Sequence, residues 1–174
     1  MSAPAPARPE SNEYAPYYER YISLVPDADL VETLERQGAE TLALLRGLSE
    51  ERGAHRYEPG KWSVKQLIGH VSDGERIFSY RALAFARGDL QALPGMEQDE
   101  WMAAVDFDAR TLADLADEFE AVRAATLHLL RHLSPEAWAR RGTASDSEVT
   151  VRALAYVIAG HEAHHVRVLR ERYL

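Results

Sequence analysis

The chain has 174 residues, 46% of them hydrophobic and 28% charged, with 28 acidic against 20 basic residues and a formal net charge of −8. This length suits one domain with a substantial core, and the acidic balance argues against a protein that binds nucleic-acid phosphates. The chain contains no cysteine, which excludes disulfides, protein thiolates in catalysis and cysteine-ligated metals.

The first residues, MSAPAPARPE, are rich in alanine and proline and lack the hydrophobic segment of a signal peptide. We predict a disordered tail over residues 1–13, a single domain over residues 14–174 and a cytoplasmic location. No hydrophobic run approaches the roughly 20 residues of a membrane span, so neither a membrane nor nucleic acid is an expected partner. The tyrosine-rich segment after residue 13 is expected to lie extended over the core.

Helical periodicity dominates the rest of the chain, and strand signals are weak. A first helix is predicted over about residues 29–48. Ser63 and Gln66 have the spacing of a capping box, which predicts the start of a second helix that ends near Arg87. Its two hydrophobic stripes indicate a deep position with more than one neighbouring helix.

A long connection follows over residues 89–109, with a short helix expected around residues 97–104. Loops of this length often cover a site or make a subunit contact. The third helix is predicted over residues 111–132, where hydrophobic residues alternate steps of three and four, a pattern typical of a bundle seam. A short helical turn at SPEAW and a loop at RRGTASDSE lead to the last helix.

The last predicted helix runs from about Thr150 to the C-terminus and directs two histidines inward. Ile158, His161 and His165 continue one seam of this helix. Four residues turn a helix by about 400°, so the two histidines lie about 40° apart and about 6 Å apart along the axis. Two imidazoles so placed can bind one ion at about 2.0–2.1 Å. The alternative is a pair of buried neutral histidines bonded to each other or to water.

A third ligand is expected from the second helix. His70 lies on its inward stripe, so we predict a metal site made of His70, His161 and His165. Gly74, one turn further, leaves a hole that could admit substrate or water. His164 lies about 60° away from His161 on the other side, and it could replace one of the ligands or lie at the rim of the site.

Three charged residues near His70 are weaker candidates. Asp73 and Glu75 could orient an imidazole through its second nitrogen or accept a proton; the alternatives are a solvated face for Asp73 and an inter-helix salt bridge for Glu75. Arg81 could receive an anionic group, although an arginine at a bundle end usually extends toward solvent. Three neutral imidazoles accept zinc, nickel, iron or manganese, so the ligands do not select the ion.

The segment PGKWSVKQLIGHVSDGE, followed about ninety residues later by HEAHHVRVL, resembles the DinB-like (DinB/YfiT) superfamily. The resemblance extends from about Tyr14 to the end of the chain. It implies an all-α four-helix bundle connected up-down-down-up, with a long crossover between the second and third helices. It also implies a divalent metal held by His70, His161 and His165, and a homodimer.

The resemblance also guides the expected function. Some members transfer or use low-molecular-weight thiols such as bacillithiol or mycothiol, and a related branch isomerises maleylpyruvate with a thiol cofactor. We expect a metal-dependent thiol S-transferase that joins such a thiol to a small electrophile. The alternatives are a metal-dependent hydrolase, a non-catalytic metal-stabilised bundle in stress response or ligand binding, and an interaction protein with three buried histidines and no metal.

Overall fold

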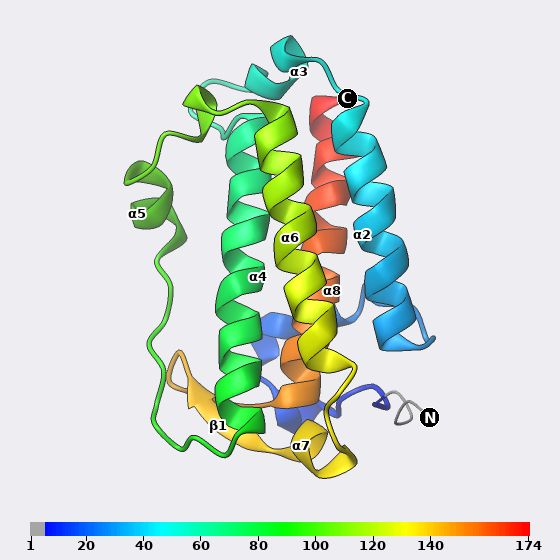
Figure 1. Ribbon diagram of the computed structural model, residues 1–174. Helices are drawn as coiled ribbons and strands as arrows, with labels where there is room; N and C mark the ends of the chain where they lie inside the picture. The colour runs from blue at the N-terminus through cyan, green and yellow to red at the C-terminus, as the bar shows by residue number, and fades with distance from the viewer. Residues whose placement is uncertain (1–5) are drawn as a thin grey trace.

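Four long helices form the centre of the computed structural model, which describes residues 6–174 (Figure 1). They are α2 (Leu30–Arg46), α4 (Val64–Ala86), α6 (Leu112–Leu130) and α8 (Val151–Val168). Helix α4 packs between α6 and α8, and α2 packs against the same two helices from the other side. Helices α2 and α8 run in one direction and α4 and α6 in the other, so the predicted up-down-down-up connection is confirmed.

Each of these helices begins with a side chain that caps a free backbone amide. The capping residues are Asp29, Ser63, Thr111 and Thr150. At Ser63, the side chain of Gln66 accepts a hydrogen bond in return, so the predicted capping box is confirmed. Such a cap stabilises a helix by about 1 kcal/mol, which explains why the helix starts are well marked in the sequence.

Shorter elements occupy the connections. They are α3 (Glu50–Ala54), α5 (Gln98–Ala103), η3 (Phe107–Ala109), α7 (Pro135–Ala139) and the final turn η4 (Leu169–Tyr173). The expected crossover therefore exists between α4 and α6, and it runs the length of the bundle with α5 near its middle (Figure 1). Among the described residues, no helix combines the length and hydrophobicity that a membrane crossing requires.

The loop predicted between α7 and α8 is wrong, because this segment forms a β-hairpin. Strands β1 (Arg141–Ala144) and β2 (Ser147–Thr150) pair antiparallel. The two turn residues, Ser145 and Asp146, have φ angles of 51° and 59°. Such turns are usually marked by Asn-Gly or Asp-Gly, so this one carries no clear signal in the sequence. The crossover supports the hairpin, since Leu93 exchanges backbone hydrogen bonds with it.

The N-terminal predictions also need correction. Residues 6–13, expected within a disordered tail, lie against the bundle, while residues 1–5 fall outside the described part of the chain. Arg8 donates hydrogen bonds to the carbonyl oxygens of Ile22 (2.9 Å) and Val25 (2.6 Å). Glu13 is buried and accepts hydrogen bonds from Thr150 and Arg152. These charged side chains anchor a segment whose composition resembles a free tail.

The tyrosine-rich segment covers the core as expected, but it is helical and not extended. It contains η2 (Pro16–Tyr18) and α1 (Glu19–Ile22), and η1 (Ser11–Glu13) directly precedes it. Helix α1 packs on α8 at Gly160, where an added Cβ would lie 2.0 Å from the carbonyl oxygen of Tyr21. Only glycine allows this approach of the two backbones, and it brings the Tyr21 ring to the inward histidines.

We expect acid to weaken the anchoring of the N-terminal segment through Glu13. Burial alone would raise the pKa of Glu13, but hydrogen bonds from Arg152, the Glu10 backbone and Thr150 lower it to about 2. A glutamate in the unfolded chain titrates near about pH 4.3, so this stabilisation is present above that pH and is lost as the pH falls toward 2. The difference in unfolding free energy between the native chain and Glu13→Gln should therefore shrink over this range; a constant difference would contradict the assignment.

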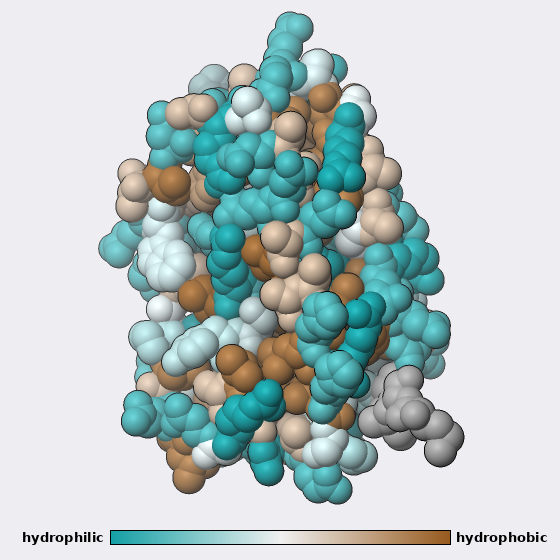
Figure 2. All heavy atoms as spheres, viewed as in Figure 1, coloured by the Kyte–Doolittle hydropathy of each residue, from teal (hydrophilic) through white to brown (hydrophobic). Residues whose placement is uncertain are grey.

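The hydrophobic core is divided along the bundle axis. One cluster contains the first turns of α8 and the last turns of α4, and the other contains the first turns of α4 and α6. Between them lies a layer of buried polar side chains, which are Thr41, His70, Glu75, Arg123, His161 and Glu162. The outer face in Figure 2 is mostly hydrophilic, with hydrophobic residues visible mainly in its lower half.

Candidate metal centre

Three histidines from two helices converge in the polar layer. Nε2 of His161 lies 3.1 Å from Nε2 of His70 and 3.1 Å from Nε2 of His165. One ligand atom from each residue lies within 4.8 Å of the other two, so this group could hold a metal ion. The structure therefore brings together the three residues predicted as ligands, although His70 precedes His161 by 91 residues in the chain.

Hydrogen bonding alone does not satisfy these three rings. Both contacts meet at the same atom, Nε2 of His161, and a neutral imidazole nitrogen either donates one hydrogen bond or accepts through one lone pair. A shared ion would accept all three lone pairs at once. In a tetrahedral zinc site with bonds of about 2.0–2.1 Å, neighbouring ligand atoms are about 3.3 Å apart, close to the observed 3.1 Å. The three residues thus fit a divalent metal.

Burial also keeps the rings neutral, as metal ligands must be. It lowers the pKa of His70 to about 4 and that of His165 to about 3. For His161, burial and then the neighbouring histidines hold the pKa well below its usual range. The lone pairs are therefore available at neutral pH without competition from protons.

The space beside Gly74 has a different use from the one predicted. The expected hole for substrate or water is filled by the ring of His161, since a Cβ added at Gly74 would lie 2.8 Å from its Cε1 atom. Glycine at this position therefore lets the α8 imidazole approach α4 closely. The sequence showed that a side chain was missing, but it did not show which neighbour used the space.

Gly74→Ala is expected to weaken metal binding about 10- to 100-fold, as is typical when a residue that orients a ligand is changed. The new methyl group would displace His161 from its two partners. Gly47→Ala is the matched control, because its Cβ would make only ordinary contacts of 3.4 Å or more. Zinc affinity measured in competition with a chelator tests this prediction, and equal affinity of the Gly74 variant and the native chain would contradict it.

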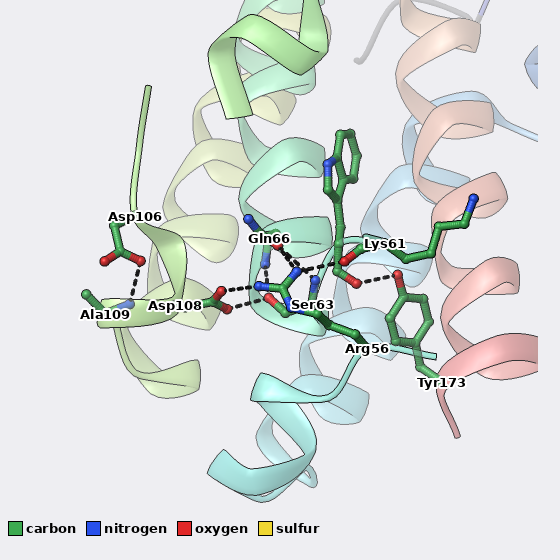
Figure 3. A network of polar contacts seen from close by, with 9 residues as sticks. Arg56, Lys61, Ser63, Gln66, Asp106, Asp108, Ala109 and Tyr173 are labelled. Atoms are coloured by element: carbon green, nitrogen blue, oxygen red, sulfur yellow. Dashed lines mark hydrogen bonds and ion pairs between the residues drawn. The ribbon is translucent and has the colours of Figure 1, made fainter. Parts of the chain in front are cut away.

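Aromatic side chains enclose the histidines. The Trp62 ring lies 4.9 Å from that of His70, and the Tyr21 ring lies 5.4 Å from that of His161. A polar network at the end of the bundle where α4 begins holds the segment that carries Trp62 (Figure 3). Tyr173 donates a hydrogen bond to the Trp62 carbonyl oxygen, and Arg56 pairs with Asp108 of η3.

Two cavities flank the histidine cluster. The larger, of about 340 Å³, is lined by His165 and His164 together with Trp62 and Lys61. The smaller, of about 110 Å³, is lined by His70 and His161 together with aromatic residues and Arg81. Gln98 at the start of α5 lines both cavities, so the long crossover reaches the rim of the site. His164 is not among the three converging histidines, and its half-buried ring faces the larger cavity.

The two carboxylates predicted near His70 do not join the cluster. Both oxygens of Glu75 accept hydrogen bonds from Arg123, at 2.9 and 2.8 Å, so the inter-helix salt bridge is the correct alternative. Five residues turn a helix by about 500°, which directs Glu75 away from His70. Asp73 pairs with Arg76, and burial raises its pKa. Neither carboxylate bonds to the histidine rings in the described structure.

A buried ion network beside the histidines was missed from the sequence. Arg123 of α6 donates hydrogen bonds to Glu75 and Glu162 and to the carbonyl oxygen of Leu34, and Thr41 donates one to Glu162. All four long helices thus contribute to it. The available signal was a charged residue at an inward position of the third helix, next to the seam residue Val122, and another at position 162 beside His161.

A four-helix bundle connected up-down-down-up, with three histidines meeting between α4 and α8, defines a helical-bundle protein with a candidate metal centre. The sequence profile of the DinB superfamily matches residues 33–169. The chain belongs to this superfamily.

Solved structures with the same fold include two of known description. YfiT from Bacillus subtilis, described as a probable metal-dependent hydrolase with an unusual four-helix bundle topology, aligns with a TM-score of 0.69 and 15% identity over 94% of this chain and 89% of its own. A mycothiol-dependent maleylpyruvate isomerase aligns with a TM-score of 0.65 and 16% identity over 83% of this chain, which spans 61% of that protein. No curated protein matches the sequence.

Proposed function

We propose that the protein is a divalent-metal-dependent enzyme of the thiol S-transferase type. The observation that carries the proposal is the meeting of three neutral imidazoles, two buried and one half-buried, at one nitrogen atom between two cavities. His70, His161 and His165 would hold the ion and leave at least one position for a ligand. When bound, the ion lowers the pKa of a coordinated thiol and so supplies a nucleophile near neutral pH.

The two cavities support a reaction with two organic reactants. The larger one, with Lys61 and aromatic walls, suits a low-molecular-weight thiol, and the smaller one suits a small electrophile. Gln98 at the start of α5 borders both cavities. The fold shared with a mycothiol-dependent enzyme is consistent with a thiol as the first reactant. A homodimer, a cytoplasmic location and a role in stress response remain predictions.

Metal-dependent hydrolysis is the second candidate, favoured by the fold shared with YfiT over most of the chain. A hydrolase would need a group that accepts a proton from water near the ion. The carboxylates considered for this task are engaged elsewhere, Glu75 with Arg123 and Asp73 with Arg76. This arrangement favours a thiol over water, because a thiol loses its proton more readily.

The test begins with protein purified without a nickel column, freed of metal and reloaded separately with zinc, nickel, iron or manganese. Each form is assayed with bacillithiol or mycothiol and a small electrophile, acrylate or acrylamide, and with p-nitrophenyl acetate in the absence of thiol. We expect conjugation that requires both metal and thiol. Ester cleavage without thiol would favour the hydrolase, and failure to bind any metal would overturn both candidates. His128→Ala, on the exposed face of α6, is the histidine control.

A further inference from the structure

The smaller cavity contains a buried cation without a counter-charge. The side chain of Arg81 belongs to a residue that is only 4% exposed, and it donates hydrogen bonds to the Pro94 carbonyl oxygen (2.6 Å) and to Ser145 Oγ (3.2 Å). Both acceptors are neutral. Among residues 6–174, no carboxylate lies within ion-pair distance of this guanidinium.

The other buried cations of the described chain are paired. Arg123 contacts Glu75 and Glu162, and Lys65 contacts Glu50 at 2.8 Å. Burial of a charge is costly unless an opposite charge and hydrogen bonds compensate. Of the buried lysines and arginines among the described residues, Arg81 is the one without a carboxylate partner. Because the chain has an excess of acidic residues, this indicates a position kept free for an external anion.

The surroundings of Arg81 favour an organic anion. No acidic residue lines this cavity, and the hydroxyl groups of Tyr17 and Tyr21 are 3.5 Å apart in the same wall. The Phe78 ring lies between Arg81 and the histidines: its centroid is 5.9 Å from Cζ of Arg81 and 5.7 Å from the ring centroid of His161. A ligand that fills this cavity would place a negatively charged group at Arg81, an apolar part against Phe78 and its other end at the histidines.

We propose that the smaller cavity binds the carboxylate of a short organic acid on Arg81, with the reactive carbon directed toward His70 and His161. This inference rests on the proposed function and names the class of its electrophilic substrate. The cavity of about 110 Å³ is smaller than the roughly 150 Å³ that accommodates benzene, so it suits an acid of a few carbon atoms. A guanidinium matches a carboxylate through two parallel hydrogen bonds.

Binding is measured by NMR titration of the metal-free protein with propionate and with propionamide, its neutral counterpart of the same shape. We expect propionate to shift the amide signals around Arg81, Met96 and Ser145 in a saturable manner, and propionamide to bind at least tenfold more weakly. Arg81→Gln should raise the Kd for propionate at least tenfold. Arg131→Gln, which removes an exposed arginine that directly follows α6, should leave the Kd unchanged.

Arg81→Lys separates a structural role from anion binding. Both substitutions alter the contacts to Pro94 and Ser145, but lysine keeps the charge, so this variant should bind propionate more tightly than Arg81→Gln. Equal binding of the two probes, or an unchanged Kd in Arg81→Gln, would overturn the proposal. Because the titration uses no metal, the two proposals can fail separately. Propionate binding without metal-dependent turnover would refute the proposed enzyme and leave the anion site intact. Turnover without propionate binding would refute the anion site and leave the proposed enzyme intact.

Discussion

Arg123→Met is expected to lower the unfolding free energy by about 3–5 kcal/mol, the usual effect of removing one partner from a buried ion pair. The substitution leaves Glu75 and Glu162 facing each other in the interior without their shared cation. It also removes a hydrogen bond to the Leu34 carbonyl oxygen. Urea unfolding at neutral pH measures the change.

Two controls separate charge from packing in this network. Replacing Glu75 and Glu162 by leucine in the Arg123→Met background should recover most of the loss, because a buried ion network and a hydrophobic one of similar volume are often equally stable. Arg131→Met breaks an exposed pair with Glu35 and should cost at most about 1 kcal/mol. An effect of Arg123→Met no larger than that of Arg131→Met would contradict the prediction.

His161→Ala is expected to abolish stoichiometric metal binding, from one ion per chain to none, with at least a 100-fold loss of affinity. The nitrogen it removes is the one that both other imidazoles approach at 3.1 Å. Elemental analysis and calorimetric titration with zinc measure the loss, and circular dichroism checks that the helices remain.

The informative control is His164→Ala, which removes the histidine considered as a replacement ligand. Its ring contacts Tyr21 and His165, and it lies outside the converging group. This variant should keep one ion per chain with nearly native affinity. Loss of the ion in His164→Ala with retention in His161→Ala would show that the ligand set is wrong.

The convergence of the histidines could be predicted because it depends on local geometry. Two residues four apart on the last helix must share a face, and their place in a hydrophobic seam directs them inward. His70 followed from the same argument on the second helix. The direction of Glu75 could have been derived in this way as well, since five residues place it far around the helix from His70.

Other features depend on contacts between distant segments, which periodicity does not encode. The inward position of Arg123 can be derived from the sequence, but its partners cannot, because the two carboxylates belong to other helices. Similarly, the hairpin turn at Ser145 and Asp146 lacks glycine. Residues 8–13 have a composition typical of free tails, yet the hydrogen bonds of Arg8 to backbone carbonyl oxygens and the ion pair of Glu13 with Arg152 hold them. These elements are fixed by tertiary partners and not by local propensity.

The polar layer between the two hydrophobic clusters has a consequence for the axial alignment of the bundle. His161 and Glu162 are adjacent on α8, yet one meets α4 and the other meets Arg123 of α6. A displacement of α8 by one helical turn, about 5.4 Å, would carry both residues into hydrophobic surroundings. It would also leave their partners on α4 and α6 buried without these contacts. Leucine seams tolerate such sliding far better, so the buried polar layer that includes the candidate metal centre also specifies a single registry of the four helices.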